Sequence, residues 1–193
     1  LYLSLGFRPD VQALKLRNFT LWQGINICKF LRDFTGSDKI KVKWPNDIYY
    51  EDKKIAGMLT EASIDCERIK TLIFGIGLNI NAPANNYPKK LKRSLMTIQS
   101  LMGNQIRLHE LSAMIIKIAL KSYIQTKNGE SENLLIDQWQ GLDAFYGKKV
   151  KVTTSNETVL GRAEGINIEG HFKVKLRNGR FKYFASVEDL EKI

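Results

Sequence analysis

The fold of this chain is decided by Lys43-Trp44-Pro45-Asn46-Asp47, which is followed by Lys54-Ile55-Ala56-Gly57 and by Gly75-Ile76-Gly77-Leu78-Asn79. The residues before the proline alternate between apolar side chains and lysines, which predicts a strand with one buried face. The proline then ends the strand and is followed by an amide and a carboxylate. A lysine and a glycine come next, at a point where a bulky side chain would obstruct a ligand. Together these stretches indicate a site for a small charged molecule.

The elements around this corner predict an α+β fold. Apolar positions at helical spacing indicate an amphipathic helix over residues 17–35, with Gly36 as its stop. Residues 48–50 and 54–64 are typical of a hairpin, and residues 69–80 of a further strand. Helical patterns follow over residues 95–101, 108–126 and 132–140. Strands gathered early and helices later favour an α+β layer over a doubly wound parallel sheet. The second of these helices has a predicted core face made of Leu111, Ile115, Ile118, Ala119 and Ile124.

From residue 148 onward the pattern changes to short strands, predicted at 150–154, 159–168, 172–176 and 181–184. Asn178-Gly179 is a strong hairpin signal between the last two. About fifty residues of short strands indicate a small barrel. We therefore predict two domains, residues 1–142 and residues 143–193.

Composition sets the broad class of the protein. The chain has 193 residues and 44% hydrophobic content, enough for a buried core. Its longest apolar run, residues 71–78, is far shorter than the roughly 20 residues that span a bilayer, and no secretory signal opens the chain. We expect a cytoplasmic protein whose two cysteines are reduced. The formal charge of +10 includes a dense basic run at residues 89–93, interpreted as a solvated loop, with a docking patch for an acidic carrier as the alternative.

These motifs resemble the central motifs of biotin protein ligases, which adenylate biotin and transfer it to a lysine of a carrier domain. The resemblance runs from Leu1-Tyr2-Leu3-Ser4-Leu5 through Leu95-Met96-Thr97-Ile98-Gln99 to the tail. It implies a catalytic domain similar to class II aminoacyl-tRNA synthetases and biotin synthetases, a mixed sheet flanked by helices, with a C-terminal SH3-like barrel. No helix-turn-helix unit can be placed in the sequence, so we expect the monofunctional type without a DNA-binding domain. The family's Gly/Arg-rich adenylate loop precedes the equivalent of Leu1, so we expect the chain to be a fragment of a longer product.

The resemblance also implies roles for individual residues. Lys54 is the expected catalytic residue, placed between the biotin carboxylate and the α-phosphate, whereas taken alone it reads as a surface lysine. Asn46 and Asp47 are expected to hold the nucleotide, with Asp47 reaching Mg²⁺ through phosphate or water, although an Asn-Asp pair is also common in plain turns. Asn79 is expected to contact the nucleotide, and Trp44 to belong to the wall or the core rather than to act in catalysis. The expected lining of the biotin pocket is Gly57, Met58, Leu59, Gly75 and Ile76.

The sequence argues against several other site chemistries. His109 and His171 have no partners at metal-ligand spacing, so no resident metal site is predicted. A phosphate-binding P-loop and a nucleophile elbow are also missing from the sequence. The nucleotide must therefore be held in another way.

The implied activity is ATP-dependent biotin protein ligation. Biotin and MgATP would give biotinyl-5′-AMP, from which biotin passes to a lysine of a biotin carboxyl carrier domain. No nucleic-acid or membrane partner is expected, and an edge strand could pair two copies in a homodimer. One alternative is a lipoate ligase, which shares this chemistry. Another is a basic nucleic-acid-binding protein, although the tail is expected to lack the clustered exposed aromatic side chains and arginines of a stacking platform. A third is an inactive fragment that still binds biotin weakly.

Overall fold

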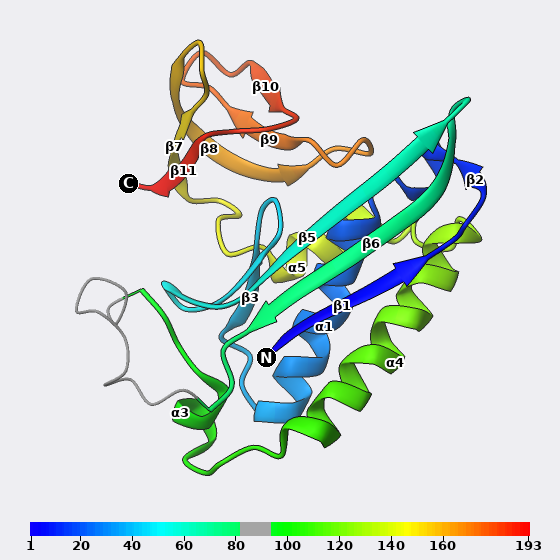
Figure 1. Cartoon of the computed structure of the whole chain (residues 1–193). Helices are drawn as coiled ribbons and strands as arrows, with labels where there is room; N and C mark the ends of the chain where they lie inside the picture. Colours follow the sequence, from blue (N-terminus) through cyan, green and yellow to red (C-terminus); the bar gives the residue numbers. More distant parts are fainter. Residues whose placement is uncertain (82–93) are drawn as a thin grey trace.

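The computed structural model describes residues 1–81 and 94–193, and its larger sheet carries the motifs (Figure 1). The strand order is β1-β6-β5-β4-β3, with β2 paired to β6. All pairings between the named strands of this sheet are antiparallel, whereas isolated parallel bridges join Val42 to Asp143 and Lys54 to Leu95, so the expected mixed sheet is mixed only at these two points. Strands β3 to β6 follow one another through short turns, and such hairpins can only be antiparallel. The strands are β1 (Tyr2–Phe7), β2 (Val11–Gln12), β3 (Ile40–Lys43), β4 (Asp47–Tyr50), β5 (Lys53–Asp65) and β6 (Arg68–Leu78).

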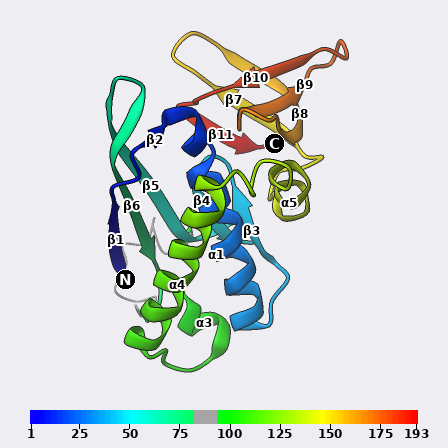
Figure 2. The same ribbon diagram turned by 90° about the vertical axis from the view of Figure 1, so that its right-hand side faces the viewer.

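Two long helices, α1 and α4, cover one face of this sheet, and for the described residues Figure 2 shows no helix over the opposite face. The two helices pack against each other, α1 contacts β3, β4 and β5, and Tyr123 of α4 stacks on Phe7 of β1. As predicted, α1 ends at Gly36, which adopts a left-handed conformation with φ of 68°. The described helices are η1 (Ala13–Leu16), α1 (Phe19–Thr35), α3 (Ile98–Met102), α4 (Leu108–Lys127) and α5 (Leu135–Leu142).

The buried stripe of α4 differs in part from the predicted one. The residues buried along this helix are Leu111, Ile115, Ala119, Ser122 and Thr126. Three of the predicted core positions are thus confirmed, and Ile118 is partly buried. Ile124, however, is 55% exposed, so its assignment to the core was wrong. Counting helical turns from the buried residues leads to 122 and 126, and polar side chains at both positions hid this continuation.

The C-terminal strands form a second antiparallel sheet with the order β10-β9-β8-β7-β11. Four of its strands were predicted, whereas β11 was missed. In the described residues no pairing joins β10 to β11, so the observed path is open. Its buried face includes Val150, Val152, Phe172 and Val174. The strands are β7 (Lys149–Thr153), β8 (Thr158–Ile166), β9 (Phe172–Lys175), β10 (Phe181–Phe184) and β11 (Asp189–Lys192).

The outer face of the second sheet carries two exposed aromatic side chains, contrary to expectation. Phe181 and Tyr183 are 45% and 48% exposed and stand two residues apart on β10. The Nζ atom of Lys173 lies 4.2 Å from the centre of the Phe181 ring. The expected lack of exposed aromatic side chains in the tail was therefore wrong, because both sit at strand positions that point away from the core.

The two sheets meet at the end of β3. The amide of Ala144 donates a hydrogen bond to the carbonyl of Val42 (2.8 Å), and the indole N–H of Trp44 donates to the carbonyl of Gly170 (2.9 Å). The Trp44 ring also stacks on Phe172, with 5.5 Å between ring centres. The strand that leads into the Pro45 corner is thus held by both sheets.

Two sequence-based expectations concern charge and membranes. The basic run Lys89-Lys90-Leu91-Lys92-Arg93 lies outside the described residues. None of the described helices combines the length and apolar character needed to cross a bilayer.

Candidate functional site

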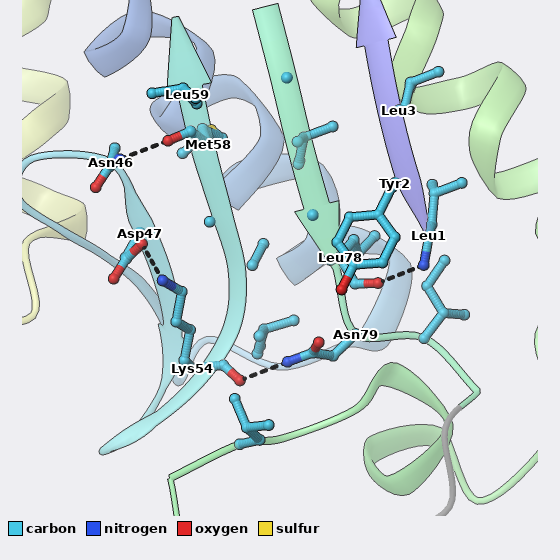
Figure 3. A pocket seen from close by; sticks show the side chains of 18 of the residues that line it. Leu1, Tyr2, Leu3, Asn46, Asp47, Lys54, Met58, Leu59, Leu78 and Asn79 are labelled. Atoms are coloured by element: carbon cyan, nitrogen blue, oxygen red, sulfur yellow. Dashed lines mark hydrogen bonds and ion pairs between the residues drawn. The ribbon is translucent and has the colours of Figure 1, made fainter. Parts of the chain in front are cut away.

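A cavity of about 740 Å³ opens on the sheet face that the helices leave bare (Figure 3). It is lined by neighbouring positions of β1, β4, β5 and β6 and by residues 79–81. The register explains why these distant stretches meet, since Asp47 pairs with Gly57, Gly57 with Gly77, and Gly77 with Tyr2. One row across four strands therefore reads carboxylate, glycine, glycine and aromatic ring.

Lys54 and Asp47 form an ion pair at the wall of this cavity. The Nζ atom of Lys54 lies 2.7 Å from Oδ1 of Asp47, and the two side chains are 38% and 19% exposed. Figure 3 shows them facing each other from adjacent strands. Gly57 makes room for the pair, because a Cβ atom at this position would lie 2.9 Å from the lysine Nζ. The site thus offers a cation that is both paired and accessible to solvent.

The backbone of Lys54 is held from two directions. Its amide donates to the carbonyl of Ser94 (2.8 Å), and its carbonyl accepts from the amide of Met96 (2.9 Å). The side-chain amide of Asn79 donates to the same carbonyl (3.2 Å). The segment around Leu95 therefore pairs with β5 through an isolated parallel bridge and holds the backbone of Lys54 in place.

Asn46 ties the proline corner to β5. Its side-chain amide donates to the carbonyl of Met58, whose own amide donates to the carbonyl of Asn46 (2.9 Å). The peptide bond between Trp44 and Pro45 is cis. Because side chains alternate along a strand, Met58 is buried toward the helices, whereas Leu59 is 60% exposed on the cavity side. Leu59 thus offers an apolar side chain, and Met58 mainly its backbone.

Two glycines of β6 leave the floor of the cavity as bare backbone. A Cβ atom at Gly75 would lie 3.8 Å from Oγ of Ser4, and one at Gly77 would lie 3.4 Å from the ring of Tyr2. Ile76 lies between these glycines. It is buried, and it also contributes to the lining of the cavity. A ligand can therefore lie close to the strands in this region.

All but one of the predicted site residues line this cavity. The exception is Trp44, which lies in a separate groove of about 400 Å³ between the two sheets, together with His171. Sequence reasoning missed Ile80, Asn81 and Leu108, which also line the cavity. Asn81 exchanges hydrogen bonds with the backbone of Ile106, a pairing that no local pattern signals.

Among the described residues, the titratable groups outside this cavity do not form a second reactive or metal-binding site. Burial raises the pKa of the Cys28 thiol to about 12, so this cysteine is unreactive. In residues 1–81 and 94–193, no group of three or more His, Cys, Asp or Glu side chains is arranged to hold a metal ion.

The chain is similar to biotin and lipoate protein ligases. Residues 1–81 match the model of the biotin/lipoate A/B protein ligase family. The chain is 30% identical over 190 residues to the bifunctional ligase/repressor BirA of Bacillus subtilis, covering 97% of this chain and 57% of the relative. It is 29% identical over 170 residues to BirA of Escherichia coli, covering 88% and 52%. The chain thus spans about half the length of the curated relatives it matches.

Several solved biotin protein ligases have the same fold as this chain. The apo biotin protein ligase of Aquifex aeolicus superposes with a TM-score of 0.81 at 23% identity, covering 100% of this chain and 82% of the other. The same ligase in complex with biotin and ATP gives a TM-score of 0.80 at 24% identity, covering 100% and 78%. The fold is therefore that of biotin protein ligases, and the resemblance inferred from the motifs is confirmed.

Proposed function

We propose that this chain carries an ATP-dependent biotin protein ligase activity. The observation that carries the proposal is the Lys54–Asp47 pair beside three glycines in one cavity, within a fold shared with a ligase solved with biotin and ATP. The cavity volume of about 740 Å³ lies within the range typical of sites for small organic ligands. The glycine floor and Leu59 suit an apolar ring system, and Lys54 suits an anion.

In the first step, an oxygen of the biotin carboxylate attacks the α-phosphorus of ATP, and the bond to pyrophosphate breaks. Both reactants are anions, so the reaction needs a cation where negative charge gathers, and Lys54 supplies it. Asn46 and Asn79 would hold the nucleotide. Mg²⁺ would enter with the phosphates and neutralise their charge, with Asp47 as its nearest protein carboxylate, the usual way this ion binds.

In the second step, the deprotonated amine of a carrier lysine attacks the carbonyl of biotinyl-5′-AMP. The bond to the phosphate oxygen breaks, AMP leaves, and an amide forms. The partner would be a biotin carboxyl carrier domain. Lys54 remains in place to stabilise the leaving phosphate.

The organisation of the chain belongs to the same proposal. Residues 1–142 would form the catalytic domain and residues 143–193 an SH3-like barrel. The second sheet, with its five strands and buried inner face, supports this division. Pairing of two copies through β1, an end strand of the larger sheet, would give a homodimer, which light scattering can measure.

The deciding experiment measures biotin transfer to a carrier domain with MgATP by the full gene product, with lipoate as a competing substrate. We expect transfer of biotin, and a loss of about a hundredfold or more in Lys54→Ala, the range seen when one stabilising donor is removed. Lys53→Ala, which removes the exposed neighbouring lysine, is the matched control and should keep full activity. Transfer of lipoate alone would move the assignment to lipoate ligases.

A second candidate function rests on the outer face of β10. Exposed Phe181 and Tyr183 beside Lys173 and Lys175 resemble a small stacking platform for single-stranded nucleic acid. Its test is binding of random oligonucleotides by wild type and by Phe181→Ser. Affinity that falls steeply with salt and is lost in the variant would support it, whereas equal weak binding by both would reject it.

A further inference from the structure

Lys43 is a second cation close to the Lys54–Asp47 pair. It is the last residue of β3 and the register partner of Asp47 across the hairpin. Ile40 and Val42 of the same strand point into the core, so alternation places Lys43 on the cavity side. Its side chain is partly buried and interacts electrostatically with Asp47 and Lys54, although it does not itself line the cavity.

Two aromatic rings hold the Lys43 ammonium. The Nζ atom lies 5.1 Å from the ring centre of Tyr49 and 5.3 Å from that of Phe145. Both distances fall within the range of cation–π attraction. Tyr49 belongs to the larger sheet, whereas Phe145 belongs to the segment that enters the second sheet. The amide of Phe145 in turn donates a hydrogen bond to Asp143 (2.8 Å).

The charges around Lys43 leave its ammonium available. Among the described residues no carboxylate lies within 4.0 Å of it. Burial lowers its pKa, while Asp47, Asp189 and Glu191 act in the opposite direction from farther away and Lys54 adds to the lowering. Lys43 therefore contributes positive field near Asp47 without being bound to it.

An anionic ligand changes the charge balance at this point. In the structure, Lys54 is paired with Asp47. If Lys54 turns toward a phosphate or carboxylate in the cavity, Asp47 is left as an uncompensated negative charge close to another anion. Such a like-charge contact in a partly buried site weakens ligand binding unless another cation compensates it.

We propose that Lys43 is a positioning residue that compensates Asp47 when Lys54 engages an anionic ligand, and that Phe145 holds it in place. This inference rests on the proposed function, since it takes ATP as the anion. It also gives Phe145, in the segment after Asp143, an indirect part in nucleotide binding. Lys43 touches neither substrate and acts only through Asp47 and Lys54.

The test compares Lys43→Met, which keeps the apolar stem, with Lys43→Arg, which keeps the charge and also stacks on rings. In the full gene product we expect Lys43→Met to raise KM for MgATP about tenfold, equivalent to about 1.4 kcal/mol, with kcat changed less than about twofold. Lys43→Arg should recover most of this loss. Lys41→Met, which removes a lysine two residues earlier on the same strand, is the matched control and should behave as wild type.

Phe145→Leu provides an independent variant, because it removes one ring and keeps apolar bulk. It should raise KM for MgATP in the same direction, by about threefold. An unchanged KM in Lys43→Met, or a Lys43→Arg variant as poor as Lys43→Met, would overturn the inference while leaving the proposed function intact.

Calorimetry of ATP binding separates the two proposals without turnover. A tenfold weaker affinity in Lys43→Met, in a protein that transfers no biotin, would support the role of Lys43 and reject the ligase activity. Equal affinities in wild type and variant would reject the role of Lys43. A wild-type protein that binds no ATP would reject both.

Discussion

Gly57 controls how the Lys54 ammonium and the Asp47 carboxylate can approach each other. A Cβ atom at this position would lie 2.9 Å from Nζ of Lys54 and 3.2 Å from Oδ1 of Asp47. Since the lysine end is flexible, the protein can accommodate the methyl group by moving the Lys54 ammonium, which is the proposed catalytic cation. We expect Gly57→Ala to lower the rate of pyrophosphate release about a hundredfold, the cost of a displacement near 1 Å in a catalytic site.

The control for this substitution is Gly6→Ala on β1, where a Cβ atom would meet nothing within 4 Å. Both variants should unfold within a few degrees of wild type, about the spread expected for mild surface changes. A Gly57→Ala protein with full activity would mean that the observed pair geometry is not the catalytic one.

At the residue scale, much of the site follows from the sequence because its members stand close together in two motifs. Lys54, Asn46 and Asp47 flank one hairpin, so local reasoning reaches all three. Trp44 was expected at the site, yet it alternates with Ile40 and Val42 and therefore shares their buried face. The place of Lys43 depends on Phe145, about a hundred residues later, and no local pattern could reveal it.

At the scale of elements, the turn between β8 and β9 is hydrogen-bonded to the start of α1. The side-chain amide of Asn18 donates to the carbonyl of Ile168 (2.9 Å), and Trp44 donates to the carbonyl of Gly170. Gly170 has φ of +80°, and a Cβ atom there would collide with Oδ1 of Asn18 and lie 2.8 Å from Leu21. We expect Gly170→Ala to lower the free energy of unfolding by more than about 2 kcal/mol, through strain and collision together.

Gly179 offers a matched comparison, because its φ is +83° but no atom lies within 4 Å of a Cβ atom there. Gly179→Ala should cost only the backbone strain, about 1 kcal/mol. Urea unfolding of both variants measures the difference. Equal losses would show that the contact with Asn18 contributes nothing.

The elements themselves were predictable where hydrophobic spacing was strong. Helix α1 and the β4–β5 hairpin appear where they were predicted. Helix α5 begins at Leu135, three residues later than predicted, since helix starts without a capping side chain leave little signal. Strand β11 was missed because Asp-Leu-Glu-Lys holds a single apolar residue, Leu190, which is buried against the second sheet.

At the scale of the whole molecule, a buried carboxyl lies where the chain passes from one sheet to the other. Asp143 is 3% exposed, and it accepts hydrogen bonds from the indole of Trp139 (3.2 Å) and the amide of Phe145 (2.8 Å). Burial raises the pKa of this carboxyl from 3.8 to about 6, and these hydrogen bonds oppose the rise without cancelling it. The folded protein therefore holds this proton more tightly than the unfolded chain does.

The pH dependence of stability follows from that difference. The contribution of Asp143 is fully present below pH 3.8 and is lost as the pH rises through about 6, amounting to about 3 kcal/mol at one pKa unit per 1.4 kcal/mol. We expect the free energy of unfolding of wild type, relative to Asp143→Asn, to fall by up to this amount between pH 4 and 7. Urea unfolding at stepped pH measures it.

Asp65→Asn, at the exposed end of β5, is the control and should run parallel to wild type over the same range. If wild type and Asp143→Asn also run parallel, the carboxyl is not protonated in the folded state, and the junction between the sheets carries a buried charge throughout.

The segment from the end of β3 to the start of β4 contacts two parts of the molecule. Val42 and Trp44 bind the second sheet and its turn, while Asp47 shapes the cavity one step beyond the corner. A substitution at these few positions can therefore disturb both the shape of the cavity and the contact between the two sheets. The two sheets therefore cannot be altered independently at these positions. A second sheet transplanted from a distant relative would have to be combined with matching residues in this segment.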